Sequence, residues 1–145
     1  MAKIKPPADI IAKRDVLHGT ESTRDLLVAH GDYFLEIDAV HDALSYFVRA
    51  DHEEGIRRIV DAAIKDGQAF LLQRIERSHR FEVTPDVWRR TAESAEKAGK
   101  LRYALTAFER AGDTERANAI RVKLGIAVEQ KVLPGTEIVD PTIST

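Results

Sequence analysis

Apolar residues recur every three or four positions through most of this chain, from residue 22 to residue 125, which is the spacing of amphipathic helices. No stretch of that span alternates apolar and polar residues as a half-buried strand does. The pattern predicts short helices over residues 22–37, 40–50, 51–67, 68–79, 84–99, 101–111 and 113–125. Because the turns between them are short, consecutive helices are expected to pack antiparallel.

Residues typical of helix N-termini support several of these boundaries. In a capping box, the N-cap side chain and an acid three residues later satisfy N–H groups that the helix leaves free. Two pairs have that spacing: Ser22 with Asp25, and Asp51 with Glu54. Thr84 and Pro85 predict the sharpest start, because a hydroxyl cap precedes a proline at the first helical position.

The helical region contains an internal repeat. Residues 42–59 and 103–120 align without gaps at an offset of 61 residues, with seven identities in eighteen positions. Ala43, Leu44, Phe47, Arg49, Ala50, Glu54 and Ile59 match Ala104, Leu105, Phe108, Arg110, Ala111, Glu115 and Ile120. A second pattern recurs three times: Leu27, Gly31, Phe34 and Asp38; Ile56, Val60, Ala63 and Gly67; Trp88, Ala92, Ala95 and Gly99. Periods of about thirty residues are typical of solenoids built from helical hairpins.

In this pattern the chain resembles the tetratricopeptide repeat (TPR) family. That repeat has a large apolar residue and a small one in its first helix, a glycine at the turn, and small, aromatic and small residues in its second helix. Residues 85–112 match it in full, with Trp88, Ala92, Gly99, Ala104, Phe108 and Ala111. Residues 24–51 match less well, because Asp38 stands at the turn where the repeat has a glycine. Residues 53–80 match in the first helix only. The resemblance implies an all-α, right-handed α-solenoid of about three antiparallel helical hairpins plus a capping helix over 114–124.

The resemblance also implies a concave surface, lined by the first helix of each hairpin, that binds peptides. Its register places these candidate partner-binding residues there: Arg57, Arg58, Arg89, Arg90 and Lys97. Guanidinium groups bind carboxylates through paired hydrogen bonds, so an acidic peptide or a chain terminus suits them. The competing interpretation is a solvated face on which the arginines pair with neighbouring acids. The family subgroup that captures chaperone C-termini uses groove asparagines, and the single asparagine, Asn118, is predicted to lie outside the groove.

The alternative function is catalytic. His41-Asp42 on a predicted helix resembles the core of the metal site in all-helical His-Asp phosphohydrolases, with His18 or His30 and Asp61 or Asp86 as further ligands. The competing interpretation is that Asp42 stabilises the N-terminal end of its helix, and that His30, His41 and His52 are surface or boundary residues. Motifs for a phosphate loop, a zinc peptidase or a serine nucleophile are missing. We therefore expect no catalysis, no metal and no cofactor, and a protein–protein interaction module such as an adaptor, assembly factor or small structural subunit.

Composition limits the class of partner. The net charge of −2 does not favour nucleic acid or an anionic membrane. A basic cluster suggests RNA, but it lacks the interleaved aromatic residues that single-stranded nucleic acid prefers; its members are Arg74, Arg77, Arg80, Arg89 and Arg90. Without cysteine, a membrane-length apolar run or a signal-peptide pattern, the chain is expected to be cytoplasmic.

The ends differ from the helical middle, which predicts three parts. These are an N-terminal arm over residues 1–21 with a lead-in helix at 7–17, a TPR-like domain over 22–125, and an extended C-terminal tail over 126–145. The tail is rich in β-branched residues and contains Pro134 and Pro141. It is either a loose terminus or an arm that docks on this protein or on a neighbour, which would give homo- or hetero-oligomers.

Overall fold

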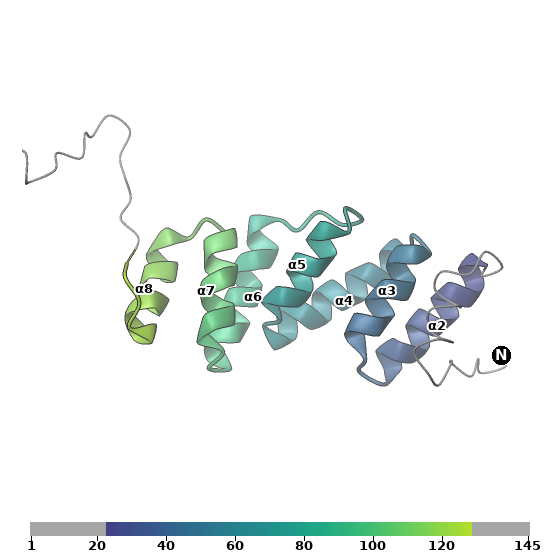
Figure 1. Ribbon diagram of the computed structural model, residues 1–145, viewed down its shortest axis with the longest axis horizontal. Helices are drawn as coiled ribbons and strands as arrows, with labels where there is room; N and C mark the ends of the chain where they lie inside the picture. Colours follow the sequence, from purple (N-terminus) through teal and green to yellow (C-terminus); the bar gives the residue numbers. More distant parts are fainter. Residues whose placement is uncertain (1–22, 129–145) are drawn as a thin grey trace, which may run out of the picture.

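The computed structural model describes residues 23–128, which form seven helices and no strand. The helices are α2 (Arg24–Glu36), α3 (Val40–Arg49), α4 (Glu53–Asp66), α5 (Ala69–Arg77), α6 (Pro85–Lys97), α7 (Leu101–Arg110) and α8 (Thr114–Leu124). They follow one another in chain order along the longest axis of the molecule, from α2 at one end to α8 at the other (Figure 1). The all-helical prediction is confirmed for this part of the chain. The predicted lead-in helix at 7–17 and the tail beyond residue 128 lie outside the described residues.

Side chains cap three of the described helices. The Thr23 hydroxyl accepts the N–H of Leu26, the Thr84 hydroxyl accepts that of Val87, and the Asp113 carboxylate accepts that of Arg116. Each cap satisfies a backbone donor that has no partner inside its own helix. Pro85 follows its cap at the first position of α6, as predicted.

The two predicted capping boxes need correction. Thr23, the residue after Ser22, caps α2. Asp51 caps no helix, because its φ of 51° places it in the left-handed region, whereas an N-cap residue has an extended backbone. Asp51 instead reverses the chain after α3, and its carboxylate lies 3.4 Å from Arg80.

Left-handed residues recur at the turns where the sequence repeat predicts them. The turns that follow α2, α4 and α6 contain Asp38, Gly67 and Gly99, with φ values of 62°, 65° and 74°. Asp38 therefore adopts the backbone conformation that glycine adopts at the two equivalent turns, which aspartate tolerates better than most residues. The departure from glycine at this position leaves the turn unchanged.

The core contains the small and aromatic residues that the repeat singles out. Ala43, Phe47, Ala104 and Phe108 have no exposed surface, and Trp88 is 2% exposed. Small residues bring neighbouring helices close together, and the aromatic rings fill the remaining space. The central alanine and phenylalanine of the repeat are therefore buried in both of its copies, whereas Leu105 and Ala111 in the second copy are partly buried.

Side chains connect helices that are not consecutive. Arg58 of α4 forms an ion pair with Asp32 of α2, at 2.5 Å. Arg74 of α5 donates to the carbonyl of His41 and the hydroxyl of Ser45, both on α3. Among the even-numbered helices, α2 contacts α4 and α4 contacts α6. Among the odd-numbered helices, α5 contacts α7. No helix in residues 24–124 has the length and apolar character needed to cross a bilayer.

Candidate functional site

All five predicted partner-binding residues are exposed and lie on α4 and α6. On α4, Arg57 forms an ion pair with Glu53 one turn earlier, at 2.7 Å, and both side chains are about two-thirds exposed. An exposed pair of this kind is weak, of order 0.3–0.5 kcal/mol, so it fixes the Arg57 side chain only loosely.

Arg58 is held more firmly than Arg57. Its guanidinium is 2.5 Å from the carboxylate of Asp32 and 5.4 Å from the centre of the Phe47 ring. These two contacts connect α4 to α2 and α3, and they orient the charge. Arg58 therefore acts mainly as a connection between helices.

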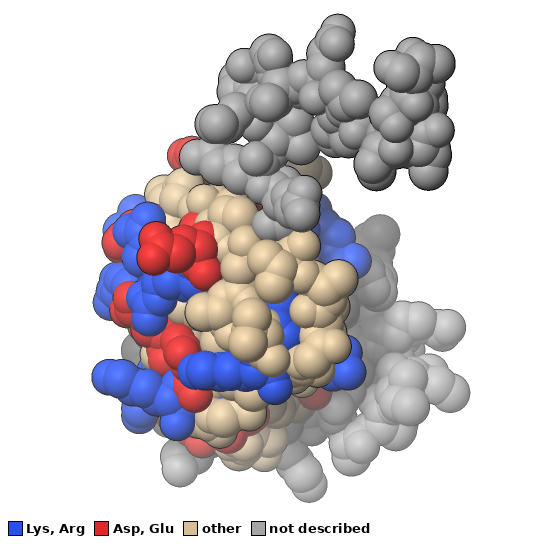
Figure 2. All heavy atoms as spheres, turned by 90° about the vertical axis from the view of Figure 1, so that its left-hand side faces the viewer, with Lys and Arg blue, Asp and Glu red and all other residues tan. Residues whose placement is uncertain are grey.

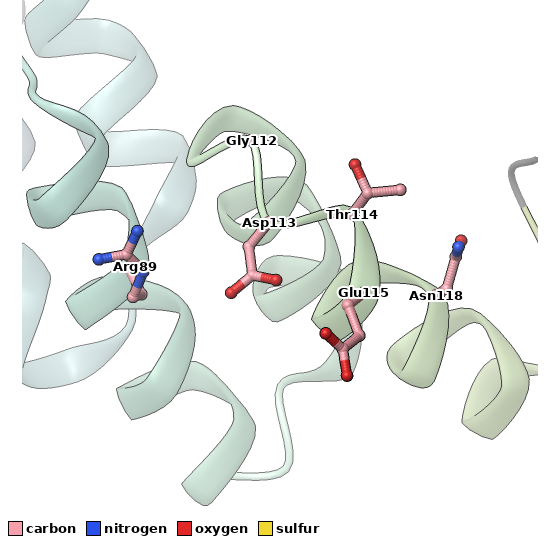
Figure 3. A pocket seen from close by; sticks show the side chains of 6 residues that line it. All are labelled: Arg89, Gly112, Asp113, Thr114, Glu115 and Asn118. Atoms are coloured by element: carbon pink, nitrogen blue, oxygen red, sulfur yellow. The ribbon is translucent and has the colours of Figure 1, made fainter. Parts of the chain in front are cut away.

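The N-terminal part of α6 lies beside a pocket. Arg89 is 3.9 Å from Asp86 on its own helix and lines a pocket of about 470 Å³. The other lining residues belong to the turn before α8 and to the first part of that helix: Gly112, Asp113, Thr114, Glu115 and Asn118. Figure 3 shows Arg89 on the α6 side of this pocket, with the Asp113 and Glu115 carboxylates on the α8 side. The pocket thus offers a cation on one side and two carboxylates on the other.

A second pocket, of about 480 Å³, lies between the same two helices and is lined by Glu93, Glu96, Lys97 and Arg116. Arg116 reaches from α8 to the carboxylates of Glu93 at 2.8 Å and Glu96 at 3.4 Å. Lys97 and Arg90 are exposed and form no ion pair with any residue between 23 and 128. Of the five predicted residues, these two are the ones whose charge is not already compensated by a described neighbour.

Arg116 also packs against the core, with its guanidinium 4.6 Å from the centre of the Phe108 ring. At the offset of 61 residues, position 116 corresponds to Gly55, so an arginine stands where the earlier repeat has a glycine. Gly55 leaves room for the Phe47 ring, whereas Arg116 covers the equivalent ring of Phe108. This departure from the repeat is the sequence signal that could have drawn attention to α8.

The structure therefore brings α8 into the candidate site. Two residues of α6, Arg89 and Lys97, line pockets there together with Asp113, Glu115, Arg116 and Asn118 from α8 and its N-cap, and the exposed Arg90 follows Arg89 on α6. We refer to these seven residues as the α6–α8 surface. Arg57 and Arg58 lie on α4, the helix that packs against α6 on its other side.

The residues nominated for a metal site form no ligand group in the part of the chain that the structure describes. In the part of the chain from 23 to 128, no three His, Asp or Glu side chains are grouped as ligands for a metal ion. His41 is exposed, and the Arg74 guanidinium lies 3.3 Å from its Nδ1 and donates to its carbonyl at 2.8 Å. A cation at that position disfavours the binding of a second cation by the same ring. His18 lies outside the described residues.

The prediction that His30 is a surface or boundary residue is wrong. Its side chain is buried, its ring stacks on Tyr46 with centroids 5.5 Å apart, and burial lowers the pKa of its imidazole. Neither His30 Nδ1 nor the Tyr46 hydroxyl has a hydrogen-bond partner within the described region. Both groups lie between α2 and α3, away from the α6–α8 surface.

Comparison of the chain with family models, with curated proteins and with solved structures finds no significant match. The resemblance to TPR proteins therefore rests on the pattern of residues in this sequence alone.

Proposed function

We propose that the protein is a non-catalytic, cytoplasmic interaction module of the TPR-like type. In this proposal the helices form a right-handed α-solenoid of three hairpins, α2–α3, α4–α5 and α6–α7, with α8 as the capping helix. Its role is that of an adaptor, assembly factor or small structural subunit that binds a segment of another protein. The buried repeat residues and the three equivalent left-handed turns support the repeat architecture.

The observation that carries the functional proposal is the position of two cations on α6. Arg89 and Lys97 each line a pocket against α8, and Arg90 between them forms no ion pair with the described neighbours. Arg89 and Lys97 are eight positions apart, which corresponds to about 12 Å along a helix. An extended segment with two carboxylates about four residues apart, or a chain terminus with one further acid, fits this spacing.

The proposed partner is therefore acidic, and recognition relies on charge and hydrogen bonds more than on apolar contact. Asp113 and Glu115 on the opposite wall of the first pocket select against segments with more than one acid at that point. The alternative function, a His-Asp metal-dependent phosphohydrolase, finds no support in the described residues, since its ligands are not grouped there.

Capture from a lysate of the organism that makes the protein, followed by mass spectrometry, tests the proposal. Wild type and the double variant Arg57→Glu/Arg89→Glu are compared, with Arg77→Glu on α5 as a matched control for the loss of an exposed arginine. We expect a defined set of acidic proteins that the control retains and the double variant releases, at an unchanged melting temperature. Identical retention by all three proteins would place binding elsewhere.

A further inference from the structure

An acidic residue recurs at one position of three even-numbered helices, α2, α4 and α6. Each acid stands five positions after a buried residue of the repeat. The acids are Asp32, Asp61 and Glu93, and the buried residues are Leu27, Ile56 and Trp88. Because equivalent positions of a repeat face equivalent neighbours, each acid is expected to face the next even-numbered helix.

The first and the last of these acids pair with an arginine of that next helix. Asp32 lies 2.5 Å from Arg58 of α4, and Glu93 lies 2.8 Å from Arg116 of α8. Figure 2 faces the α8 end of the molecule and shows basic and acidic side chains interleaved along one side of it. The charges of these two pairs are therefore compensated within the protein.

The middle contact, between α4 and α6, lacks this ion pair. Arg90 of α6 stands at the repeat position of Arg58, 32 residues later, and is the expected partner of Asp61. Both Asp61 and Arg90 are exposed, and neither forms an ion pair or a side-chain hydrogen bond with any residue between 23 and 128. Since α4 and α6 pack against each other, a carboxylate and a guanidinium are left open where the two helices meet.

An aromatic ring that α5 lacks accounts for the difference. Each paired arginine packs on a ring of the odd-numbered helix before its own: Arg58 at 5.4 Å from the centre of Phe47, and Arg116 at 4.6 Å from the centre of Phe108. In the small–aromatic–small spacing of the repeat, α5 has the buried Ile75 at the position of the ring. The arginine of α6 therefore has no ring there to hold it, and an exposed ion pair alone fixes a side chain only weakly.

We infer that the acidic partner segment also carries a basic residue, which pairs with Asp61 while a carboxylate of the segment pairs with Arg90. This inference rests on the proposed function and specifies the charge pattern of its partner. A segment with acids alone brings a further negative charge beside Asp61, which repulsion between like charges disfavours. A segment with both signs instead completes, between α4 and α6, the ion pairing that the protein itself makes at the contacts on either side.

Selection of blocked peptides by the immobilised full chain tests this charge pattern. Every peptide in the pool has two glutamates at the separation proposed for the α6 cations, and the residue midway between them is either lysine or glutamine. The remaining positions are random and uncharged. We expect wild type to enrich the lysine peptides over the glutamine peptides by about two- to fivefold, the ratio that one exposed ion pair supports.

Asp61→Lys gives the decisive comparison. It should reverse the preference, so that glutamine peptides are enriched over lysine peptides. Asp66→Lys makes the same change of charge on the same helix and should keep the wild-type preference. Both positions are exposed, so circular dichroism should show that the helices are retained. A preference for lysine that persists in Asp61→Lys would place the basic residue of the segment against another acid and overturn the inference.

Arg90→Glu separates the inference from the proposed function. If wild type binds both kinds of peptide equally and Arg90→Glu loses both, the proposed function stands and the inference is wrong. If wild type enriches no peptide, or if Arg90→Glu enriches both kinds as wild type does, the proposed function fails and the inference fails with it.

A double-mutant cycle tests whether Asp61 and Arg90 pair with each other in the free protein. The losses of stability in Asp61→Asn and Arg90→Gln should add in the double variant, whereas those in Asp32→Asn and Arg58→Gln should not. Coupling of Asp61 to Arg90 as strong as that of Asp32 to Arg58 would show that the protein closes the middle contact by itself, which would also overturn the inference.

Discussion

The phenyl ring of Phe47 occupies the space into which a side chain on Gly55 would extend. A Cβ atom at Gly55 would lie 2.6 Å from Cδ1 and Cγ of that ring, closer than real Cβ contacts allow. Gly31 faces the same ring from α2, and a Cβ atom there would also overlap it. Phe47 of α3 is thus inserted between a glycine of α2 and a glycine of α4, which explains why both helices have a glycine in their interior.

Gly55→Ala should therefore destabilise the protein, although alanine is normally the better helix former by about 0.5–1 kcal/mol. Overpacking of the Phe47 ring should reduce the free energy of unfolding by about 1–3 kcal/mol, measured by chemical denaturation. In the double variant Gly55→Ala/Phe47→Leu, the smaller leucine makes room for the new methyl group. Its loss of stability should therefore be smaller than the sum of the losses in the two single variants. A stability gain from Gly55→Ala alone would contradict this packing arrangement.

Phe108→Ala tests whether the second copy of the repeat is a packing unit. The side chain is fully buried, so its removal should cost about 3–5 kcal/mol of stability in the same denaturation measurement. Phe70→Ala is the control, because that ring is 54% exposed and makes an edge contact with Tyr103. The repeat interpretation predicts a much larger loss at position 108 than at position 70, and comparable losses would count against it.

His30 should make stability depend on pH. Burial lowers the pKa of its imidazole below the ordinary value of 6.5, so the unfolded chain takes up the proton first as the pH falls. Its contribution to stability is complete above that ordinary value and is lost as the pH drops below it. His30→Phe keeps a ring against Tyr46 and should flatten the decline in melting temperature between about pH 7 and about pH 5. The exposed His41→Gln should leave the decline in place; an unchanged profile in His30→Phe would show that other groups cause it.

Tyr46→Phe should stabilise the protein. The hydroxyl of Tyr46 is buried without a hydrogen-bond partner in the described region, and both burial and the charge of Asp42 raise its pKa. Removal of an unsatisfied buried hydroxyl should add about 1 kcal/mol to the free energy of unfolding. Tyr33→Phe, at a half-buried ring on the preceding helix, serves as the comparison and should change stability less. A loss of stability in Tyr46→Phe would indicate a hydrogen bond to that hydroxyl.

The sequence predicts the described helices to within two residues at each end, because local signals determine them. The three- or four-residue spacing of apolar positions fixes each helix, and residues such as Thr84 and Gly67 mark where one begins or ends. The burial of Ala43, Phe47, Ala104 and Phe108 follows from the repeat, since equivalent positions in a repeat face equivalent neighbours.

The candidate site was only partly predictable, because its contacts join residues far apart in the chain. Arg58 and Asp32 are 26 positions apart, and Arg116 and Glu93 are 23 apart. Whether such side chains meet depends on how neighbouring helices are rotated, which the apolar pattern leaves open. The burial of His30 was missed for a similar reason, since a single histidine carries no sign of whether an aromatic ring will cover it.

The central claim is that cations on α6 bind an acidic segment of a partner protein, and Arg90 tests it most directly. Its guanidinium is exposed and forms no ion pair with the described residues, so its replacement removes no contact within that part of the molecule. Titration calorimetry with the partner identified by capture would compare Arg90→Glu with Arg77→Glu. We predict that Arg90→Glu weakens binding by about tenfold or more, equivalent to at least about 1.4 kcal/mol, while Arg77→Glu binds like wild type. Equal affinities for the two variants would contradict the account.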